Sequence, residues 1–315
     1  MSEIALQLVL GIGLLLFSAR ALVKLAEKLP SSFKISPLFI GITVVALGTS
    51  LPELAVSAVA LMRNDIGLAM GNIIGSNIVN VLLVFPIGIL IGKLRIGTTK
   101  TQRNALILIA VTALFIFLNT IISPNFPSGL VLIISGIILT IAEYNWAIFG
   151  RKHEDSSKMK HLKKEKFTLS EVITLVFSAV GIVAGGYITV TSTQMLSTIT
   201  GYSTTVLGLT VTAFATSLPE LFTTVFAQEE HQEKLTIGNI LGSNIYNLLF
   251  IGGIIDLYRT KTFIPYTDWV ILALSAILFL IVIRKYSGER VSKWVGIILI
   301  LCFLAYIYWL SRIRG

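Results

Sequence analysis

The sequence predicts an all-α membrane protein with ten transmembrane helices, arranged as two inverted five-helix repeats with interrupted helices. Of the 315 residues, 55% are hydrophobic and 13% are charged, and the mean hydropathy is +0.86. Soluble domains carry about 25% charged residues, so this composition indicates a membrane protein. Apolar runs recur along the whole chain, and one polar motif occurs twice inside such runs.

Breaks in hydropathy divide the chain into ten apolar segments. A helix needs about 20 apolar residues to cross about 30 Å of hydrocarbon. The first segment begins with Glu3 instead of basic residues and is too long for a signal peptide, so we expect it to be retained. The predicted spans are 4–29, 36–62, 68–92, 104–123, 127–149, 169–196, 203–227, 235–256, 267–284 and 291–310.

The basic residues sort by the connection in which they lie. A net charge of +9 alone is compatible with nucleic-acid binding. However, 20 of the 25 Lys and Arg residues fall in connections that would share one side of the membrane, and 5 fall on the other side. The positive-inside rule then places the richer side in the cytoplasm and both termini outside. We therefore expect a multi-pass protein of the cell membrane. Its expected partner is the lipid bilayer, and no nucleic-acid binding is expected.

A duplication organises the sequence. Residues 41–83 align with 208–250 without a gap at a constant offset of 167, and 21 of the 43 positions are identical. The sequence T-S-L-P-E stands at Thr49–Glu53 and again at Thr216–Glu220. A carboxylate within hydrocarbon costs about 2.5–3.5 kcal/mol on insertion scales, so it is rarely kept without a use.

The duplication predicts a division into three parts. Residues 1–149 form the first five-helix repeat and residues 169–315 form the second. The basic stretch 150–168 is expected to be a cytoplasmic linker held by anionic headgroups, with a regulatory or lipid-sensing role as the alternative. Because each half has an odd number of spans, the second half enters the membrane from the opposite side. Inverted repeats are typical of alternating-access transporters, whose site lies near the midplane where interrupted helices meet.

The motif residues predict a site made of oxygen atoms. Pro52 and Pro219 lack an N–H, which leaves the carbonyls of Gly48 and Ala215 without helical donors. Helical spacing is expected to place the hydroxyls of each motif on the face of its own glutamate. Such hard oxygen donors suit Ca²⁺ and Na⁺, and no His or Cys joins them. The duplication has a second shared block, residues 71–80 and 238–247. It contains two further pairs with a spacing of four residues, Ser76 with Asn80 and Ser243 with Asn247.

Other polar and small residues near the motifs have structural interpretations. Close helix packing is expected for the glycines Gly71, Gly75, Gly238 and Gly242. Hydrogen bonding between helices is at least as well supported as ion contact for Asn72, Asn77, Asn239 and Asn244. The acids Glu143 and Asp256 lie towards segment ends, where solvation at the membrane interface is expected.

At these residues the chain resembles the cation/Ca²⁺ exchanger superfamily, whose two inverted repeats contain G-T-S-L-P-E and G-N-x-x-G-S-N. Gly48–Glu53 and Gly71–Asn77 match these patterns in the first half. Ala215–Glu220 and Gly238–Asn244 match them in the second half, with alanine in place of the first glycine. The length and the ten-helix plan are similar to those of prokaryotic Na⁺/Ca²⁺ exchangers.

The resemblance implies an antiporter that exchanges Na⁺ for Ca²⁺, with three Na⁺ per Ca²⁺. It implies a Ca²⁺ site that uses Glu53, Glu220 and the carbonyls of Thr49 and Thr216. The G-S-N form favours Na⁺ as the coupling ion, and Ca²⁺/H⁺ exchange by the same glutamates is the alternative. The resemblance implies Na⁺ sites that draw on Ala46, Ser50, Ser76, Ala213, Ser217 and Ser243, with Asn80 and Asn247 as neutral ligands or ligand supports. Asn247 replaces an aspartate of many relatives, which weakens an inference of K⁺ co-transport.

Other functional classes fit the sequence less well. An intramembrane hydrolase needs a nucleophile with a base, or paired aspartates, at membrane depth, and the sequence contains neither arrangement. An open channel is harder to exclude, but an inverted duplication favours alternating access. No cofactor is expected, only the transported ions Ca²⁺ and Na⁺. The sequence is compatible with a monomer.

Overall fold

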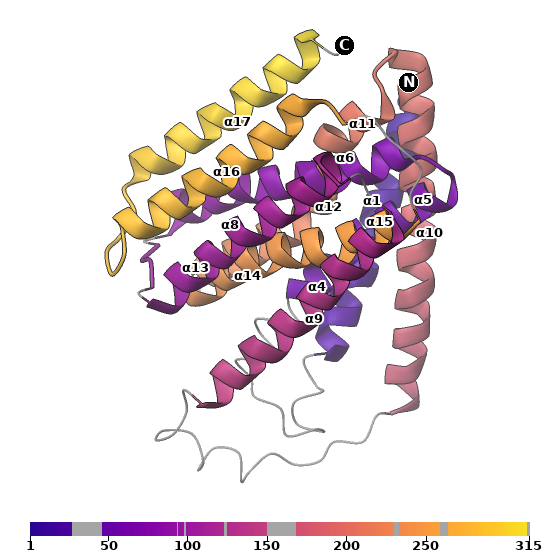
Figure 1. Cartoon of the computed structure of the whole chain (residues 1–315). Coiled ribbons are helices and arrows are strands. Elements are labelled where there is room, and N and C mark those ends of the chain that lie inside the picture. Colours follow the sequence, from indigo (N-terminus) through magenta and orange to yellow (C-terminus); the bar gives the residue numbers. More distant parts are fainter. Residues whose placement is uncertain are drawn as a thin grey trace.

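The computed structural model describes residues 1–26, 46–92, 94–97, 99–122, 125–149, 168–229, 233–258 and 264–313. Every regular element in these ranges is a helix (Figure 1). Strand-like pairing in the described residues is limited to two isolated bridges, which join residues 95–96 to residues 287 and 290. The predicted linker 150–168 lies outside the described residues except for Thr168.

Nine helices in the described ranges are long and apolar enough to cross a membrane. Six of them are single α-helices: α1 (Ser2–Ala26), α8 (Thr99–Thr120), α9 (Phe126–Phe149), α10 (Leu169–Thr200), α16 (Tyr266–Lys285) and α17 (Lys293–Ile313). The other three combine shorter pieces: α6 (Ile66–Val79), η2 (Asn80–Val84) and α7 (Phe85–Ile91); α11 (Thr204–Leu207), η4 (Gly208–Thr212), α12 (Ala213–Thr216) and α13 (Leu218–Glu229); and α14 (Glu233–Tyr246), η5 (Asn247–Ile251) and α15 (Gly252–Leu257).

The predicted span 36–62 is described only from residue 46. It contains α4 (Ala46–Thr49) and α5 (Leu51–Met62), which is apolar but shorter than a full span. The described segments follow the order and approximate bounds of the predicted spans. Both chain ends lie at the same end of the molecule (Figure 1).

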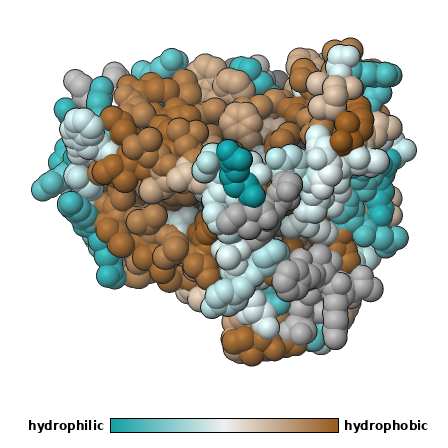
Figure 2. All heavy atoms as spheres, turned by 90° about the horizontal axis from the view of Figure 1, so that it is seen from above, coloured by the Kyte–Doolittle hydropathy of each residue, from teal (hydrophilic) through white to brown (hydrophobic). Residues whose placement is uncertain are grey.

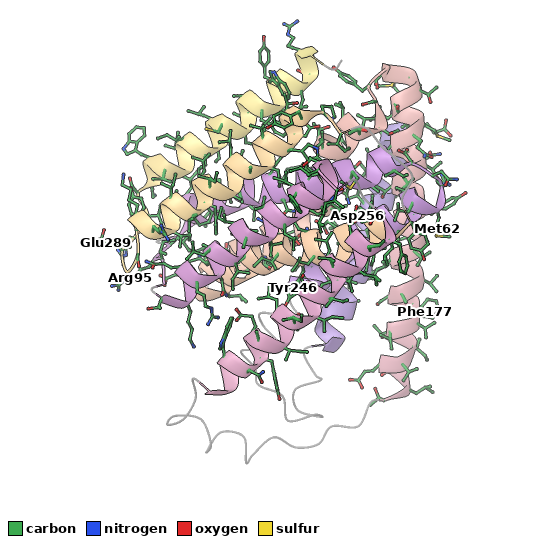
Figure 3. The ribbon with its side chains drawn as sticks, in the orientation of Figure 1. Met62, Arg95, Phe177, Tyr246, Asp256 and Glu289 are labelled. Atoms are coloured by element: carbon green, nitrogen blue, oxygen red, sulfur yellow. The ribbon has the colours of Figure 1, made fainter. Side chains whose placement is uncertain are left out.

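The outer helices present apolar side chains and the central helices are buried. Phe177 on α10 is 72% exposed and Met62 at the end of α5 is 84% exposed, and both point away from the bundle (Figure 3). Hydrophobic residues cover a broad area of the surface seen from above, bordered on its left by hydrophilic residues (Figure 2). Exposed apolar surface of this extent fits contact with lipid. By contrast, α6 is buried along nearly its whole length.

In the first half, the glycines of the second shared block, Gly71 and Gly75, bring two central helices into close contact. A Cβ atom on Gly75 would lie 2.6 Å from the carbonyl oxygen of Leu209, and one on Gly71 would collide with the carbonyl of Thr205. The close-packing prediction is therefore confirmed for this pair. Their counterparts Gly238 and Gly242 instead line a small cavity of about 40 Å³ beside α8 and α9.

Three π-helical turns lie in the central helices and were not predicted. They begin at Asn80, Gly208 and Asn247, and two of these positions are predicted site residues. A π-turn accommodates an extra residue, which changes the direction of the side chains around it, and such turns are frequent at functional sites.

Candidate functional site

The helix is interrupted at the serine of each motif. Ser50 separates α4 from α5 with φ −84° and ψ 5°, and Ser217 separates α12 from α13 with φ −80° and ψ 5°. Pro52 lies in the first turn of α5, where a missing N–H costs no helical hydrogen bond. The predicted interruptions are therefore confirmed. Each glutamate then lies in the first turn of a new helix, where the helix dipole favours negative charge.

The motif serines contact the glutamate of the other repeat. Ser50 Oγ donates a hydrogen bond of 3.5 Å to Glu220 Oε1, and Ser217 Oγ donates one of 3.5 Å to Glu53 Oε1. Helical spacing had related each serine only to its own glutamate. The hydrogen bonds of the two serines cross between the repeats, so the two motifs face each other.

The motif threonines and the first asparagine in each copy of the second shared block form a second reciprocal set. Thr49 Oγ1 donates to Asn239 Oδ1 at 3.2 Å, and Thr216 Oγ1 donates to Asn72 Oδ1 at 3.1 Å. Asn72 Nδ2 also donates to the carbonyl of Glu53 at 3.3 Å. Asn239 makes the equivalent bond to Glu220, at 3.5 Å. The interpretation of Asn72 and Asn239 as interhelical hydrogen-bonding residues is confirmed.

The second shared block completes the site but departs from the reciprocal pattern. Asn80 Nδ2 donates to Asn244 Oδ1 at 3.0 Å, whereas Asn247 Nδ2 donates to Ser76 Oγ at 3.3 Å. The hydroxyls of Ser243 and Thr49 are 3.2 Å apart. Both asparagines at the start of π-turns, Asn80 and Asn247, thus donate hydrogen bonds from their amide nitrogens to neighbouring side chains.

Four buried oxygens at the centre receive no hydrogen bond. They are Oε2 of Glu53 and Glu220 and Oδ1 of Asn80 and Asn247, all in side chains that are 0% exposed. Buried acceptors are normally satisfied, because each unpaired one costs about 1–3 kcal/mol. Among the described residues, no Lys, Arg or His forms an ion pair with either glutamate. The negative charge and the free acceptors therefore suit a cation from solution.

The chemistry of the site is that of hard oxygen ligands. Within the described ranges, no group of three or more His, Cys, Asp and Glu residues could hold a metal. Two carboxylates with neutral amides and hydroxyls fit Ca²⁺ and Na⁺ better than zinc or copper. The residues predicted for the site are all at most 4% exposed: Ala46, Thr49, Ser50, Glu53, Ser76, Asn80, Ala213, Thr216, Ser217, Glu220, Ser243 and Asn247.

The two predicted alanines contribute through their carbonyl groups to their own turns. Ala46 accepts from Thr49 Oγ1 at 3.1 Å, and Ala213 accepts from Thr216 Oγ1 at 3.4 Å. These bonds hold each threonine hydroxyl between its own turn and the opposite repeat.

One further acid is buried against expectation. Asp256 is 0% exposed and accepts a 3.1 Å hydrogen bond from Asn119 Nδ2, so its predicted solvation at the interface was wrong (Figure 3). Asn119 is a polar residue inside an apolar segment, and it was the available signal for a buried partner. Glu143, in contrast, keeps 14% of its side chain exposed and pairs with Arg103 at 2.9 Å.

Comparison with known proteins agrees with this chemistry. The family described as sodium/calcium exchanger protein matches residues 4–142 and 170–312, which is most of the chain. The chain belongs to the sodium/calcium exchanger family. It is therefore a multi-pass membrane protein from a family of transporters, not of enzymes.

Individual proteins match along nearly the whole chain. The sodium/calcium exchanger MaX1 of Methanosarcina acetivorans is 27% identical over 339 aligned positions, covering 95% of this chain and 96% of the relative. The membrane protein MJ0091 of Methanocaldococcus jannaschii is 29% identical and covers 94% of each chain. Solved structures of the sodium-calcium exchanger NCX_Mj match with a TM-score of 0.68 and 26% identity over 99% of both chains.

Proposed function

We propose that the chain is a secondary antiporter that exchanges Na⁺ for Ca²⁺ across the cell membrane by alternating access. The observation that carries this proposal is the set of four buried, unpaired oxygens on Glu53, Glu220, Asn80 and Asn247. A site with two carboxylates and no internal counter-charge is stable only when cations or protons occupy it. Since both repeats supply the oxygens reciprocally, a relative movement of the repeats would expose the same site to either side.

The proposed Ca²⁺ ligands are the carboxylates of Glu53 and Glu220 with the carbonyls of Thr49 and Thr216. Na⁺ would use the surrounding neutral oxygens: those of Ala46, Ser50, Ser76, Asn80, Ala213, Ser217, Ser243 and Asn247. The contact between Asn247 and Ser76 supports a shared subsite for these two residues. The reciprocal contacts between the motifs support the inverted five-helix repeats, 1–149 and 169–315. The distribution of basic residues supports ten spans with both termini outside.

The coupling ion can be tested by Ca²⁺ flux in vesicles that contain the purified protein. Imposed Na⁺ and proton gradients are applied separately, with the other gradient collapsed by an ionophore. Uptake driven by the Na⁺ gradient alone is the expected result. Uptake driven only by the proton gradient would identify the alternative, a Ca²⁺/H⁺ exchanger in which the same glutamates carry protons.

The stoichiometry has an electrical test. Three Na⁺ per Ca²⁺ would move one net charge per cycle, which couples transport to voltage by about 2.3 kcal/mol per 100 mV. Vesicle-based electrophysiology should then record a current when Na⁺ and Ca²⁺ exchange. Verified transport without current, and with two Na⁺ counted per Ca²⁺, would contradict the three-ion assignment.

A further inference from the structure

Two connections far apart in the sequence are held together by backbone hydrogen bonds. Ile96 N–H donates to the carbonyl of Glu289 at 3.0 Å, and Val291 N–H donates to the carbonyl of Leu94 at 2.9 Å. The buried side chains of Leu94, Ile96 and Val291 anchor this pairing in the core. The connection before α8 and the connection between α16 and α17 thus form one structured surface, which we term the paired-loop surface.

This pairing places two arginines directly opposite each other. Arg95 and Arg290 form an antiparallel bridge, flanked on both sides by the hydrogen bonds above. In this type of pair the Cα atoms are only about 4.5 Å apart and the side chains are closest. Like charges in opposed positions destabilise strand pairing, so an anion that binds both would stabilise it. Both side chains are exposed.

The protein itself supplies little compensating charge at this surface. Among the described residues, no carboxylate forms an ion pair with Arg95 or Arg290. Glu289 lies beside Arg95 at the edge of the molecule, but is outside ion-pair distance (Figure 3). Arg95 Nε donates to the carbonyl of Gly288 at 2.8 Å, which orients its guanidinium and leaves the remaining N–H groups available. Lys285 and Lys293, at the adjoining helix ends, are also exposed.

The position of this surface identifies the kind of anion. It lies where α16 ends and α17 begins, and both helices are long and apolar enough to cross a membrane. Trp294, the second residue of α17, is 72% exposed. Tryptophan at a helix end is typical of the headgroup level of the bilayer. A phosphate at that level belongs to a lipid, and arginine pairs suit phosphate oxygens.

We infer that Arg95 and Arg290 form a binding site for the phosphate group of an anionic phospholipid, which joins the α7–α8 connection to the α16–α17 connection. The corresponding connection of the first half, residues 121–125, contains no charged residue. The site is therefore a feature of one end of the molecule and is not generated by the duplication.

The test measures phosphatidylglycerol binding to the full-length protein by native mass spectrometry, with phosphatidylcholine as the competitor. We expect the double variant Arg95→Gln/Arg290→Gln to lose about tenfold or more in phosphatidylglycerol affinity. The matched control Lys285→Gln/Lys293→Gln removes the same charge from the same surface but not from the bridge. We expect it to lose less than about threefold.

Equal losses in the two double variants would overturn the inference, because they would indicate diffuse attraction by the whole surface. Unchanged binding in Arg95→Gln/Arg290→Gln would overturn it as well. The variant Arg95→Lys/Arg290→Lys keeps both charges and should retain most of the affinity even if the glutamine variant folds poorly. Displacement of the lipid by inorganic phosphate at equal concentration would also contradict a lipid site, since a soluble anion would then suffice.

Discussion

The two ends of the proposed ion site differ although the motifs around them are nearly identical. On one side, a cavity of about 330 Å³ between α1 and α13 reaches Thr49 and Pro219, and we term this the open end. The rings of Phe222 and Phe226 beside it are 51% and 49% exposed. At the corresponding positions of the first half, 167 residues earlier, stand Ala55 and Val59, each only 8% exposed.

The corresponding surface of the first half, which we term the closed end, is filled by contact between α10 and α5. A Cβ atom on Gly186 would lie 3.2 Å from the carbonyl oxygen of Ala55, so the two backbones already touch. The guanidinium of Arg63 covers the ring of Tyr187 at 4.1 Å. Duplicated ligands therefore do not imply duplicated access. The residues that flank each motif decide which end is packed, and the proposed alternating access would need such a difference between the ends.

Substitution of either glutamate should have the same effect, although the two ends of the site differ. We expect Glu53→Gln and Glu220→Gln each to lower Ca²⁺ transport by about 100-fold or more. Each substitution removes one proposed carboxylate partner of the buried Ca²⁺, and loss of one partner of a buried charge pair costs about 3–5 kcal/mol. Ca²⁺ uptake into vesicles measures the effect, and the thermal midpoint should confirm a folded protein. Near-normal uptake by either variant would remove that glutamate from the site.

The π-turn asparagines should differ because their hydrogen-bond partners differ. Asn247→Asp introduces a titratable charge beside Ser76, and we expect a severalfold change in the Na⁺ or pH dependence of Ca²⁺ uptake. Asn80→Asp is the matched variant, with Asn244 as its neighbour. Unchanged ion and pH profiles in Asn247→Asp would place this residue outside the functional site.

Much of the site could be predicted from local sequence. Pro52 and Pro219 predicted the interruptions because proline removes a backbone donor wherever it stands. The oxygen-rich composition around Glu53 and Glu220 predicted hard cation ligands for a similar reason, since donor type does not depend on tertiary structure.

The remaining features depend on contacts across the fold. Helical spacing relates residues within one helix only, so it could not place Ser50 beside Glu220. The π-turn at Asn80 and the burial of Asp256 likewise depend on neighbouring helices. The difference between the ends comes from small and aromatic residues whose roles become visible only when α1 and α10 are placed beside the motifs.

Packing at the closed end offers a direct test of the difference between the ends. Gly186→Val would place two methyl groups against α5, and we expect it to lower the free energy of unfolding by about 1–3 kcal/mol. Ala19→Val is the comparison variant, because Ala19 lies on α1 and lines the cavity at the open end. Its effect should stay below about 1 kcal/mol in thermal or denaturant unfolding. Equal destabilisation by both substitutions would contradict the assignment of an open and a closed end.

The smallest expected effect concerns the hydrogen bonds that hold α10 at the closed end. Asp65 Oδ1 caps α6 through Leu68 N–H at 3.0 Å, while Asp65 Oδ2 accepts from Gln194 Nε2 at 3.0 Å. Gln194 Oε1 in turn accepts from Arg63 at 3.0 Å. Asp65→Asn retains an oxygen for the helix cap, but its Nδ2 cannot accept from Gln194. Because this network is partly buried, its loss should destabilise the closed end by about 1 kcal/mol.

The substitution should therefore increase opening of the closed end by only severalfold. The readout is the labelling rate of Val59→Cys by a soluble maleimide in a Cys302→Ser background, since Val59 is 8% exposed and Cys302 is exposed. Glu143→Gln is the control. It likewise replaces a hydrogen-bonded carboxylate by an amide, but that carboxylate pairs with Arg103 and is not part of the network at the closed end. Faster labelling with Asp65→Asn but not with Glu143→Gln would support a local effect. An unchanged labelling rate would show that the contact of Gly186 with Ala55, not this network, keeps the end closed.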